Sequence, residues 1–275
     1  MNNENITSIE NVTLLIPIYP PHYHYMYKLI DSLKLHSIKI DIHLIFSNMA
    51  DYDTFSMKDC IIPIVCDAYQ TRSIITYKKF FGLKQLAHFK YEYIICCDSE
   101  IDIIHNNFTA DNINSKIKQI FNTKTIYAGN ADGNSVGTLI TQTSANLFQD
   151  KYDYLKHVTK NFTLYFWWSD LPVYRTLDIT PFFKMISYDS IVWEHFDYII
   201  YQYYLILSDD FKIIDTTPIT NTHWSLEMLF TDNVDILNKL VDINYGFSWI
   251  TQRLYNLNKN FINTQKGFLI YHLDR

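Results

Sequence analysis

An alternation of strand-like and helix-like segments in the first half of the chain constrains the fold more than any other feature. Continuous apolar runs predict four buried strands, at residues 12–18, 40–46, 60–66 and 93–97. Apolar residues that recur every three or four positions predict helices at 23–33 and 74–89. Strands that alternate with helices in this way form a mostly parallel sheet covered on both faces. We therefore expect an α/β fold.

The carboxyl ends of the predicted strands indicate where a ligand would bind. In open α/β sheets, ligands bind in the crevice beyond these ends. The loops that we expect to share one rim follow Ile18, Phe46, Cys66 and Cys97. In the helix at 74–89, the residues expected to face inward are Ile75, Leu83 and Leu86.

The pattern changes after about residue 127. Residues 128–137 hold three of the six glycines and are expected to form a loop or turn. A helix around 193–207, a strand at 211–214 and two further helices, the first opening at Ser225, are expected to follow. Because no internal repeat or Pro/Gly/Ser-rich linker interrupts the chain, we expect residues 1–275 to form one domain.

Composition and charge exclude several classes of protein. The net charge of -6 lacks the basic footprint that nucleic acids require. The four cysteines form no CxxC pair, so we expect reduced, buried thiols rather than a zinc site or disulfides. No apolar run approaches the roughly 20 residues that span a bilayer, and the polar start lacks a secretory signal. We expect a cytoplasmic protein without a transmembrane segment.

Two carboxylates follow the last predicted strand, in the stretch YEYIICCDSE. In extended backbone, residues two apart face the same way, so Asp98 and Glu100 can converge on one cation. Hard oxygen ligands at a strand end suit Mg²⁺ or Mn²⁺ that bridges two phosphates. A solvated acidic turn is the alternative interpretation.

A family resemblance extends this interpretation. The stretch YKKFFGLKQLAHFKYEYIICCDSE resembles nucleotide-diphospho-sugar glycosyltransferases of the GT-A fold, in which a basic helix precedes a strand ending in a D-x-D motif. The opening VTLLIPIYP resembles their first strand. Glu100 departs from the commonest pattern, which has Asp there. The resemblance covers about residues 10–135 and implies a donor-binding half there, with an acceptor-binding half at about 136–275.

The resemblance also implies roles for particular residues on the donor side. Asp98 and Glu100 would hold the metal, with Asp98 also near the donor, and Ile18 and Tyr19 would contact the base. The cationic residues that would meet the diphosphate or orient the donor are Arg72, Lys78 and Lys79, for each of which a solvated helix face is an equal alternative. The implied donor is a nucleotide sugar, and a UDP-sugar is the expectation by analogy.

A late histidine is a further metal ligand in many such enzymes. His223 lies in the polar stretch TTPITNTHWS, beside Trp224. As a ligand it would favour Mn²⁺ over Mg²⁺. A structural histidine is the alternative interpretation.

Transfer with inversion needs a carboxylate to take the proton of the acceptor hydroxyl. The stretch FWWSDLPVY offers Asp170 beside two tryptophans, and WEHFDYIIY offers Glu194 and Asp197. Asp170 is otherwise a turn or cap residue, and Glu194 favours any helix start. Asp197 interrupts an aromatic and aliphatic run and is the first choice, followed by Asp170 and Glu194. Inversion and retention both stay open.

The sequence leaves other functions open besides a metal-dependent glycosyltransferase acting on a glycan or glycoconjugate. One is a metal-dependent phosphohydrolase on a doubly wound sheet. A nucleotidyltransferase would want a Gly-rich phosphate loop after the first strand, where this chain has Tyr19-Pro20-Pro21. Another is a non-catalytic module that binds a nucleotide or a glycan.

Overall fold

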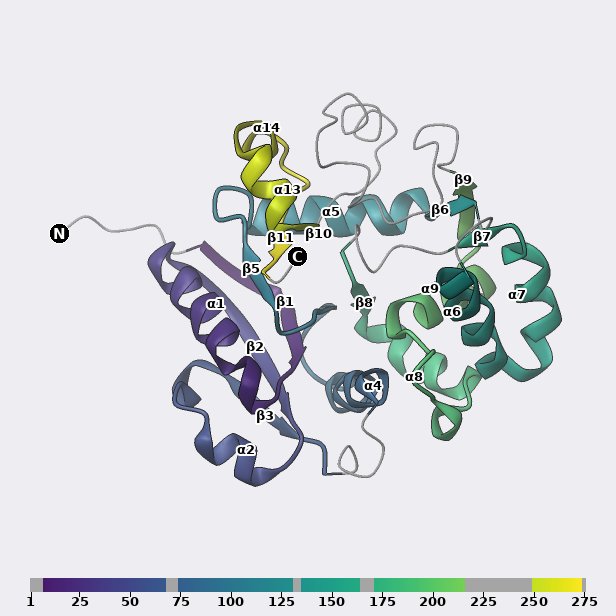
Figure 1. Cartoon of the computed structure of the whole chain (residues 1–275), viewed down its shortest axis with the longest axis horizontal. Coiled ribbons are helices and arrows are strands. Elements are labelled where there is room, and N and C mark those ends of the chain that lie inside the picture. The colour runs from purple at the N-terminus through teal and green to yellow at the C-terminus, as the bar shows by residue number, and fades with distance from the viewer. Residues whose placement is uncertain (1–6, 68–73, 131–134, 164–170, 216–248, 274–275) are drawn as a thin grey trace.

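A five-stranded sheet forms the centre of the protein, whose structure is a computed structural model (Figure 1). The structure describes residues 7–67, 74–130, 135–163, 171–215 and 249–273. The strand order is β3 (Ile62–Val65), β2 (Ile38–Phe46), β1 (Thr7–Pro17), β4 (Tyr93–Cys96) and β8 (Val173–Arg175). The first four strands are parallel and β8 is antiparallel to β4. The expected α/β class, with a mostly parallel sheet flanked by helices, is confirmed.

Helices α1 (Tyr23–Leu35) and α4 (Ile75–Leu86) lie on opposite sides of this sheet (Figure 1). The residues of α1 that face the core are spaced three or four apart, which is why this segment forms an amphipathic helix. They are Tyr23, Met26, Leu29, Ile30 and Leu33. In α4, Leu83 and Leu86 are buried as expected. The expectation for Ile75 is wrong: it is 45% exposed, because it occupies the first turn at the mouth of a pocket.

Helix α4 approaches the sheet closely at Gly82. A Cβ atom there would overlap the Cδ1 of Ile45 and lie 3.0 Å from the Cδ1 of Leu15. Both contacted residues are buried strand residues, Leu15 in β1 and Ile45 in β2. Glycine therefore lets the helix axis come near the sheet, which holds the start of α4 beside the ends of β1 and β4.

Two smaller sheets and further helices complete the described structure. One smaller sheet has the strand order β10 (Trp249–Thr251), β11 (Ile270–His272) and β5 (Ile101–Ile103). The other has the order β7 (Phe162–Thr163), β6 (Thr125–Asn130) and β9 (Lys212–Asp215). The other helices are α2 (Met49–Thr54), α5 (Ala110–Thr123), α6 (Ser135–Ala145), α7 (Tyr152–Thr159), α8 (Thr176–Met185), α9 (Asp197–Ser208), α13 (Gln252–Leu257) and α14 (Lys259–Thr264). No helix in these described segments is long and apolar enough to span a membrane.

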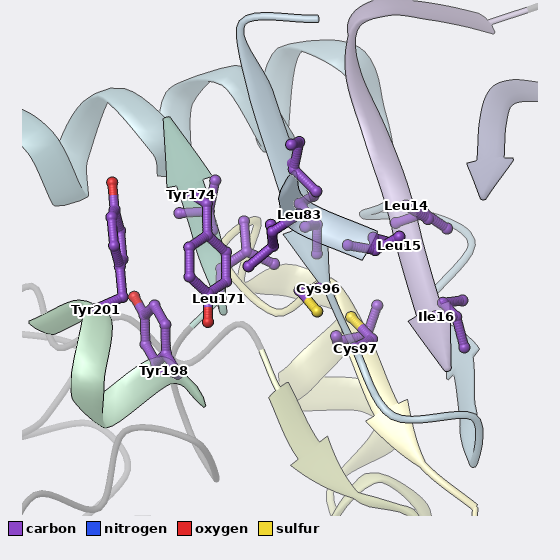
Figure 2. Close-up of a cluster of buried hydrophobic side chains, with 14 of the residues drawn as sticks. Leu14, Leu15, Ile16, Leu83, Cys96, Cys97, Leu171, Tyr174, Tyr198 and Tyr201 are labelled. Carbon is purple, nitrogen blue, oxygen red and sulfur yellow. The ribbon is translucent and has the colours of Figure 1, made fainter. Parts of the chain in front are cut away.

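One cluster of buried side chains joins both halves of the chain, from Ile9 to Ile270. Figure 2 shows a part of it in which strand residues of β1 and β4 lie beside Leu83 of α4 and the tyrosines of β8 and α9. All four cysteines are free, as expected, and Cys66, Cys96 and Cys97 are buried, but Cys60 is only half-buried. A shared core of this kind is compatible with a single α/β domain.

The second half differs from expectation in two places. Residues 125–130 form strand β6, although the sequence predicts a loop from 128, because β6 pairs with the distant strands β7 and β9. Helix α9 begins at Asp197 rather than near Trp193. The reason is a turn closed by His195, whose Nδ1 accepts a hydrogen bond from the Val192 amide at 2.9 Å. The helix expected from Ser225 lies outside the described residues.

Candidate functional site

A pocket of about 350 Å³ lies where the strand order of the central sheet reverses. The chain runs from β1 outward to β2 and β3, then returns to β4 on the other side of β1. Such a switch point leaves a crevice between two carboxyl ends, because the loops leave in opposite directions. The residues that line the pocket are Pro17, Ile18, Tyr19 and His22 after β1, Ile75 and Lys78 of α4, Asp98, Ser99 and Glu100 after β4, and His272.

Asp98 forms an ion pair on one side of this pocket. Its Oδ1 lies 2.9 Å from Nζ of Lys79, and the same ammonium lies 3.0 Å from Oδ1 of Asp197. The hydroxyl of Tyr174 donates to Oδ2 of Asp197 at 2.9 Å. Burial alone would lower the pKa of Lys79, but the Asp197 and Asp98 carboxylates outweigh burial and raise it well above its usual value. Lys79 is therefore a charged, buried group between two acids.

Glu100 is held by a different partner. The Nδ1–H of His22 is shared between Oε1 of Glu100 at 2.8 Å and Oγ of Ser99 at 2.7 Å. The Ser99 hydroxyl donates to Oε2 of Glu100 at 3.0 Å, and Tyr19 bonds to Nε2 of His22. Two prolines start the short turn Pro20–His22, since proline fixes the backbone for the first helical positions. The turn thereby joins the loop after β1 to the loop after β4.

Lys78 joins two more loops at the same rim. Its Nζ donates to the carbonyl oxygen of Ile18 at 2.5 Å and to Oγ of Ser47 at 2.9 Å, so it bridges the segments after β1 and β2. The side chain is buried although it lines the pocket, and burial lowers its pKa to about 8, against smaller opposing effects of Cys66 and Asp51. These contacts confirm that the loops after Ile18 and Phe46 share a rim.

A smaller pocket of about 80 Å³ adjoins the first. Asp98 and Ile75 line both pockets. The remaining wall combines aromatic and polar side chains and comes from α4, the end of β4, the residue before β8, the segment that leads into α9 and the start of that helix. Its residues are Thr76, Lys79, Cys96, Pro172, Trp193, His195, Phe196, Asp197 and Tyr198. Trp193 is 67% exposed, which leaves its indole ring open to a ligand.

His272 is a pocket residue that the sequence did not indicate. It is buried at the end of β11, which pairs antiparallel with β5, directly after Glu100. The Leu273 amide also donates to the Glu100 carbonyl at 2.7 Å. This register brings the end of the described chain to the acidic loop. A histidine in the apolar run FLIYHL was the only local signal, and it does not fix the pairing partner.

Carboxylates in the first pocket fit a divalent cation that arrives with its own oxygen ligands. Among the described residues, no group of three His, Cys, Asp or Glu side chains is arranged to hold a metal alone. Asp98 and Glu100 nevertheless line the same pocket, and 37% of the Asp98 side-chain surface is exposed. Mg²⁺ is commonly bound through one or two carboxylates together with substrate phosphates and water. The donor set present suits this mode and not a complete protein cage.

The structure brings most of the predicted site residues together. The first pocket is lined by Ile18, Tyr19, Lys78, Asp98 and Glu100, and the second by Lys79, Asp98 and Asp197. Glu194 is half-buried and lines neither pocket. Arg72, Asp170 and His223 lie outside the described residues. Lys79 differs from expectation, since its ammonium contacts two carboxylates.

Compared with models of protein families and with the sequences of curated proteins, the chain matches none. A functional interpretation therefore depends on the geometry of the two pockets and on the chemistry of their walls.

Proposed function

We propose that this protein is a metal-dependent glycosyltransferase of the GT-A type. As a hexosyl- or pentosyltransferase, it would move a sugar from a nucleotide-diphosphate sugar to a hydroxyl of a glycan or glycoconjugate. The observation that carries the proposal is that Asp98 lies in the shared wall of two adjoining pockets. Transfer requires a donor and an acceptor to meet at one point in a defined orientation. A UDP-sugar is the proposed donor, by analogy with the family that the sequence resembles.

The larger pocket is proposed to bind the donor. Ile18 and Tyr19 follow β1 and would contact the base, and Tyr19 is 42% exposed. Lys78 supplies a buried positive charge in the same wall, which favours an anionic ligand. This combination suits a nucleoside diphosphate better than a neutral sugar.

Asp98 and Glu100 would hold Mn²⁺ or Mg²⁺ together with the diphosphate oxygens. A divalent cation held there would neutralise the negative charge that develops on the diphosphate as the glycosidic bond breaks. His22 and Ser99 fix the Glu100 carboxylate through hydrogen bonds to both of its oxygens. Whether His223 adds a nitrogen ligand stays a prediction.

The smaller pocket is proposed to bind the acceptor next to the anomeric carbon. Exposed aromatic surface such as that of Trp193 suits the apolar face of a sugar ring. Both oxygens of Asp197 already accept hydrogen bonds, from Lys79 and Tyr174, which argues for a positioning role rather than that of the base. Asp170, two residues before the pocket residue Pro172 in the sequence, then becomes the first candidate for the base in an inverting reaction.

A non-catalytic module that binds a nucleotide is the second candidate. It is favoured by the pairing of both acidic side chains with internal cations or donors, Asp98 with Lys79 and Glu100 with His22. Such a module would bind the donor and release no product.

A thermal-shift panel of UDP-, GDP-, CMP- and dTDP-sugars, each with Mn²⁺, Mg²⁺ or EDTA, tests the proposed donor class. A ligand at 100 times its Kd adds roughly 2.7 kcal/mol of stability, so a true donor raises the Tm measurably. We expect one nucleotide family to stabilise the protein only with metal, and Asp98→Ala to abolish the effect. Asp31→Ala, at an exposed position of α1, is the matched control and should retain it. No shift with any nucleotide sugar would overturn the proposal and direct attention to phosphatase substrates.

A further inference from the structure

Lys79 lies between two carboxylates that belong to different parts of the site. Its Nζ is 2.9 Å from Asp98, which lines both pockets, and 3.0 Å from Asp197, which lines only the smaller one. The lysine is 7% exposed and Asp197 is 5% exposed. A long, flexible cation is thus fixed in one place by two acids.

The two ends of this cluster differ in their access to solvent. At the inner end, Asp197 accepts hydrogen bonds at both oxygens, from Lys79 and from Tyr174. At the outer end, Asp98 has 37% of its side-chain surface exposed and faces the larger pocket. Two carboxylates and one ammonium leave one net negative charge in the cluster. Water and a second cation can reach that charge only at Asp98, because the carboxylate of Asp197 is buried.

A divalent cation that binds Asp98 has to compete with the ammonium already in contact with it. Two like charges a few ångströms apart repel strongly where water is partly excluded. Asp197 gives the ammonium another partner at nearly the same distance, so Lys79 can release Asp98 without becoming a lone buried charge. The protein therefore holds the lysine ready for exchange rather than as a permanent partner of Asp98.

We propose that Lys79 is an internal counter-ion that competes with the divalent cation for Asp98, so that the site takes the cation together with a nucleoside diphosphate and not as the free ion. The inference rests on the proposed function, because it takes Asp98 as a metal ligand. Lys79 acts here as a positioning residue. It keeps Asp98 oriented before binding and pairs with Asp197 alone afterwards.

Replacement of the inner pair tests the competition. Lys79→Met alone leaves the buried Asp197 without its cation and threatens folding. The double variant Lys79→Met/Asp197→Asn removes one positive and one negative charge, so the net charge of the cluster is unchanged and long-range attraction for cations is preserved. The amide oxygen introduced at position 197 can still accept the hydrogen bond of Tyr174. Free Mn²⁺ is titrated into each protein and followed by electron paramagnetic resonance, with and without UDP.

The wild type is expected to bind Mn²⁺ weakly alone and much more tightly with UDP. The double variant is expected to bind Mn²⁺ alone on the order of tenfold more tightly than the wild type, because the competing ammonium is gone. Asp197→Asn alone should have the opposite effect and weaken Mn²⁺ binding, because Lys79 then has only Asp98 as its carboxylate partner. A merely structural lysine would produce no gain in affinity in the double variant.

Three results separate the ways in which the proposals can fail. If Mn²⁺ binds with UDP and Asp98→Asn abolishes binding, but the double variant binds free Mn²⁺ no more tightly, the counter-ion proposal is overturned and the proposed function survives. If no protein binds Mn²⁺ with UDP, nor with GDP, CMP or dTDP in the same titration, both are overturned. If the double variant does not fold, as judged by circular dichroism, Asp197→Asn alone decides: unchanged or tighter Mn²⁺ binding contradicts the proposal.

Discussion

The imidazole of His22 lies 2.8 Å from the carboxylate of Glu100, and this contact connects the loop after β1 to the loop after β4. These loops form two walls of the larger pocket. A nucleotide that spans the pocket touches both walls, so its affinity depends on their relative position.

We predict that His22→Ala weakens binding of UDP with Mn²⁺ by about tenfold. Loss of a hydrogen bond to a charged group corresponds to about 1.5–3 kcal/mol, and one factor of ten is about 1.4 kcal/mol. Isothermal titration calorimetry measures the change. The control is His24→Ala, an exposed histidine two residues further along the chain, which should bind as the wild type does. Equal affinities for His22→Ala and wild type would show that the His22–Glu100 contact does not shape the site.

Lys78 gives the donor pocket a dependence on pH. Because burial lowers its pKa to about 8, the ammonium loses its proton as the pH rises from about 7 to about 9. We predict that UDP affinity falls over this range in the wild type, and that Lys78→Met binds more weakly at neutral pH but with a flatter profile. Lys84→Met, at an exposed position near the end of α4, is the control and should keep the wild-type slope. A Lys78→Met profile as steep as that of the wild type would contradict the assignment.

The contribution of Lys78 to folding stability changes with pH in the opposite direction to its contribution to UDP affinity. Its pKa in the folded state lies below the usual value of 10.5, so between about pH 8 and 10.5 the unfolded chain binds more protons than the folded one. The free energy of unfolding contributed by this group therefore rises across that window. Urea unfolding measures the free energy of unfolding of the wild type and of Lys78→Met. Relative to the variant, the wild type should become more stable as the pH increases.

A buried histidine outside the site makes the fold sensitive to acid. His43 is fully buried; its Nε2 lies 3.2 Å from the hydroxyl of Tyr91, which itself donates to Asp41, so Nε2 is the donor. Its Nδ1 is buried without a hydrogen-bond partner, and protonation there would create a lone buried charge. Burial lowers the pKa of His43 to about 4.

The folded protein thus keeps His43 neutral where the unfolded chain binds a proton. The corresponding stability is complete above about pH 6.5 and is lost as the pH falls towards 4. The wild type loses free energy of unfolding as the pH falls, because His43 resists protonation. We predict that His43→Gln, which keeps a donor for Tyr91, makes this loss smaller by up to about 3 kcal/mol. Urea unfolding at about pH 7 and about pH 4.5 measures it. Identical losses in the variant and the wild type would show that another group is responsible.

The close approach of α4 to the sheet predicts a coupled pair of core substitutions. Gly82→Ala should destabilise the protein by about 1–3 kcal/mol, since its methyl group overlaps Ile45 and overpacking outweighs the better helix propensity of alanine. Ile45→Val removes the Cδ1 that is overlapped. In a double-mutant cycle, the two changes together should therefore cost less than the sum of each alone. Additive effects would mean that the helix shifts instead.

Local patterns in the sequence were sufficient to predict the parallel strands of the first half and the shared rim at their ends. Continuous apolar runs identify strands such as β2, and the position of Asp98 and Glu100 shortly after the last of these strands predicts that both acids lie at the edge of the sheet where the pocket is found. These inferences depend only on neighbours along the chain. They led to a pocket that the sheet topology independently places between β1 and β4.

The partners of these acids could not be predicted in the same way. Lys79 meets Asp197 across a distance that depends on how α4 packs against α9, and periodicity says nothing about that packing. His272 reaches the pocket only because β11 pairs with β5. Tertiary contacts of this kind changed the proposed role of Lys79 from a ligand of the diphosphate to a counter-ion of Asp98.

The proposed function requires that the pocket at Asp98 breaks the bond between a sugar and a nucleoside diphosphate. The wild type and Asp98→Asn are each incubated with Mn²⁺, a candidate acceptor and the donor that the binding experiments identify. Mass spectrometry of the products then shows which bond is broken. We expect the wild type to release the free nucleoside diphosphate, dependent on Mn²⁺ and accelerated by acceptor, with at least about a hundredfold loss in Asp98→Asn. Release of a nucleoside monophosphate with a sugar phosphate would refute the proposal, because the phosphate linkage would then be the bond broken.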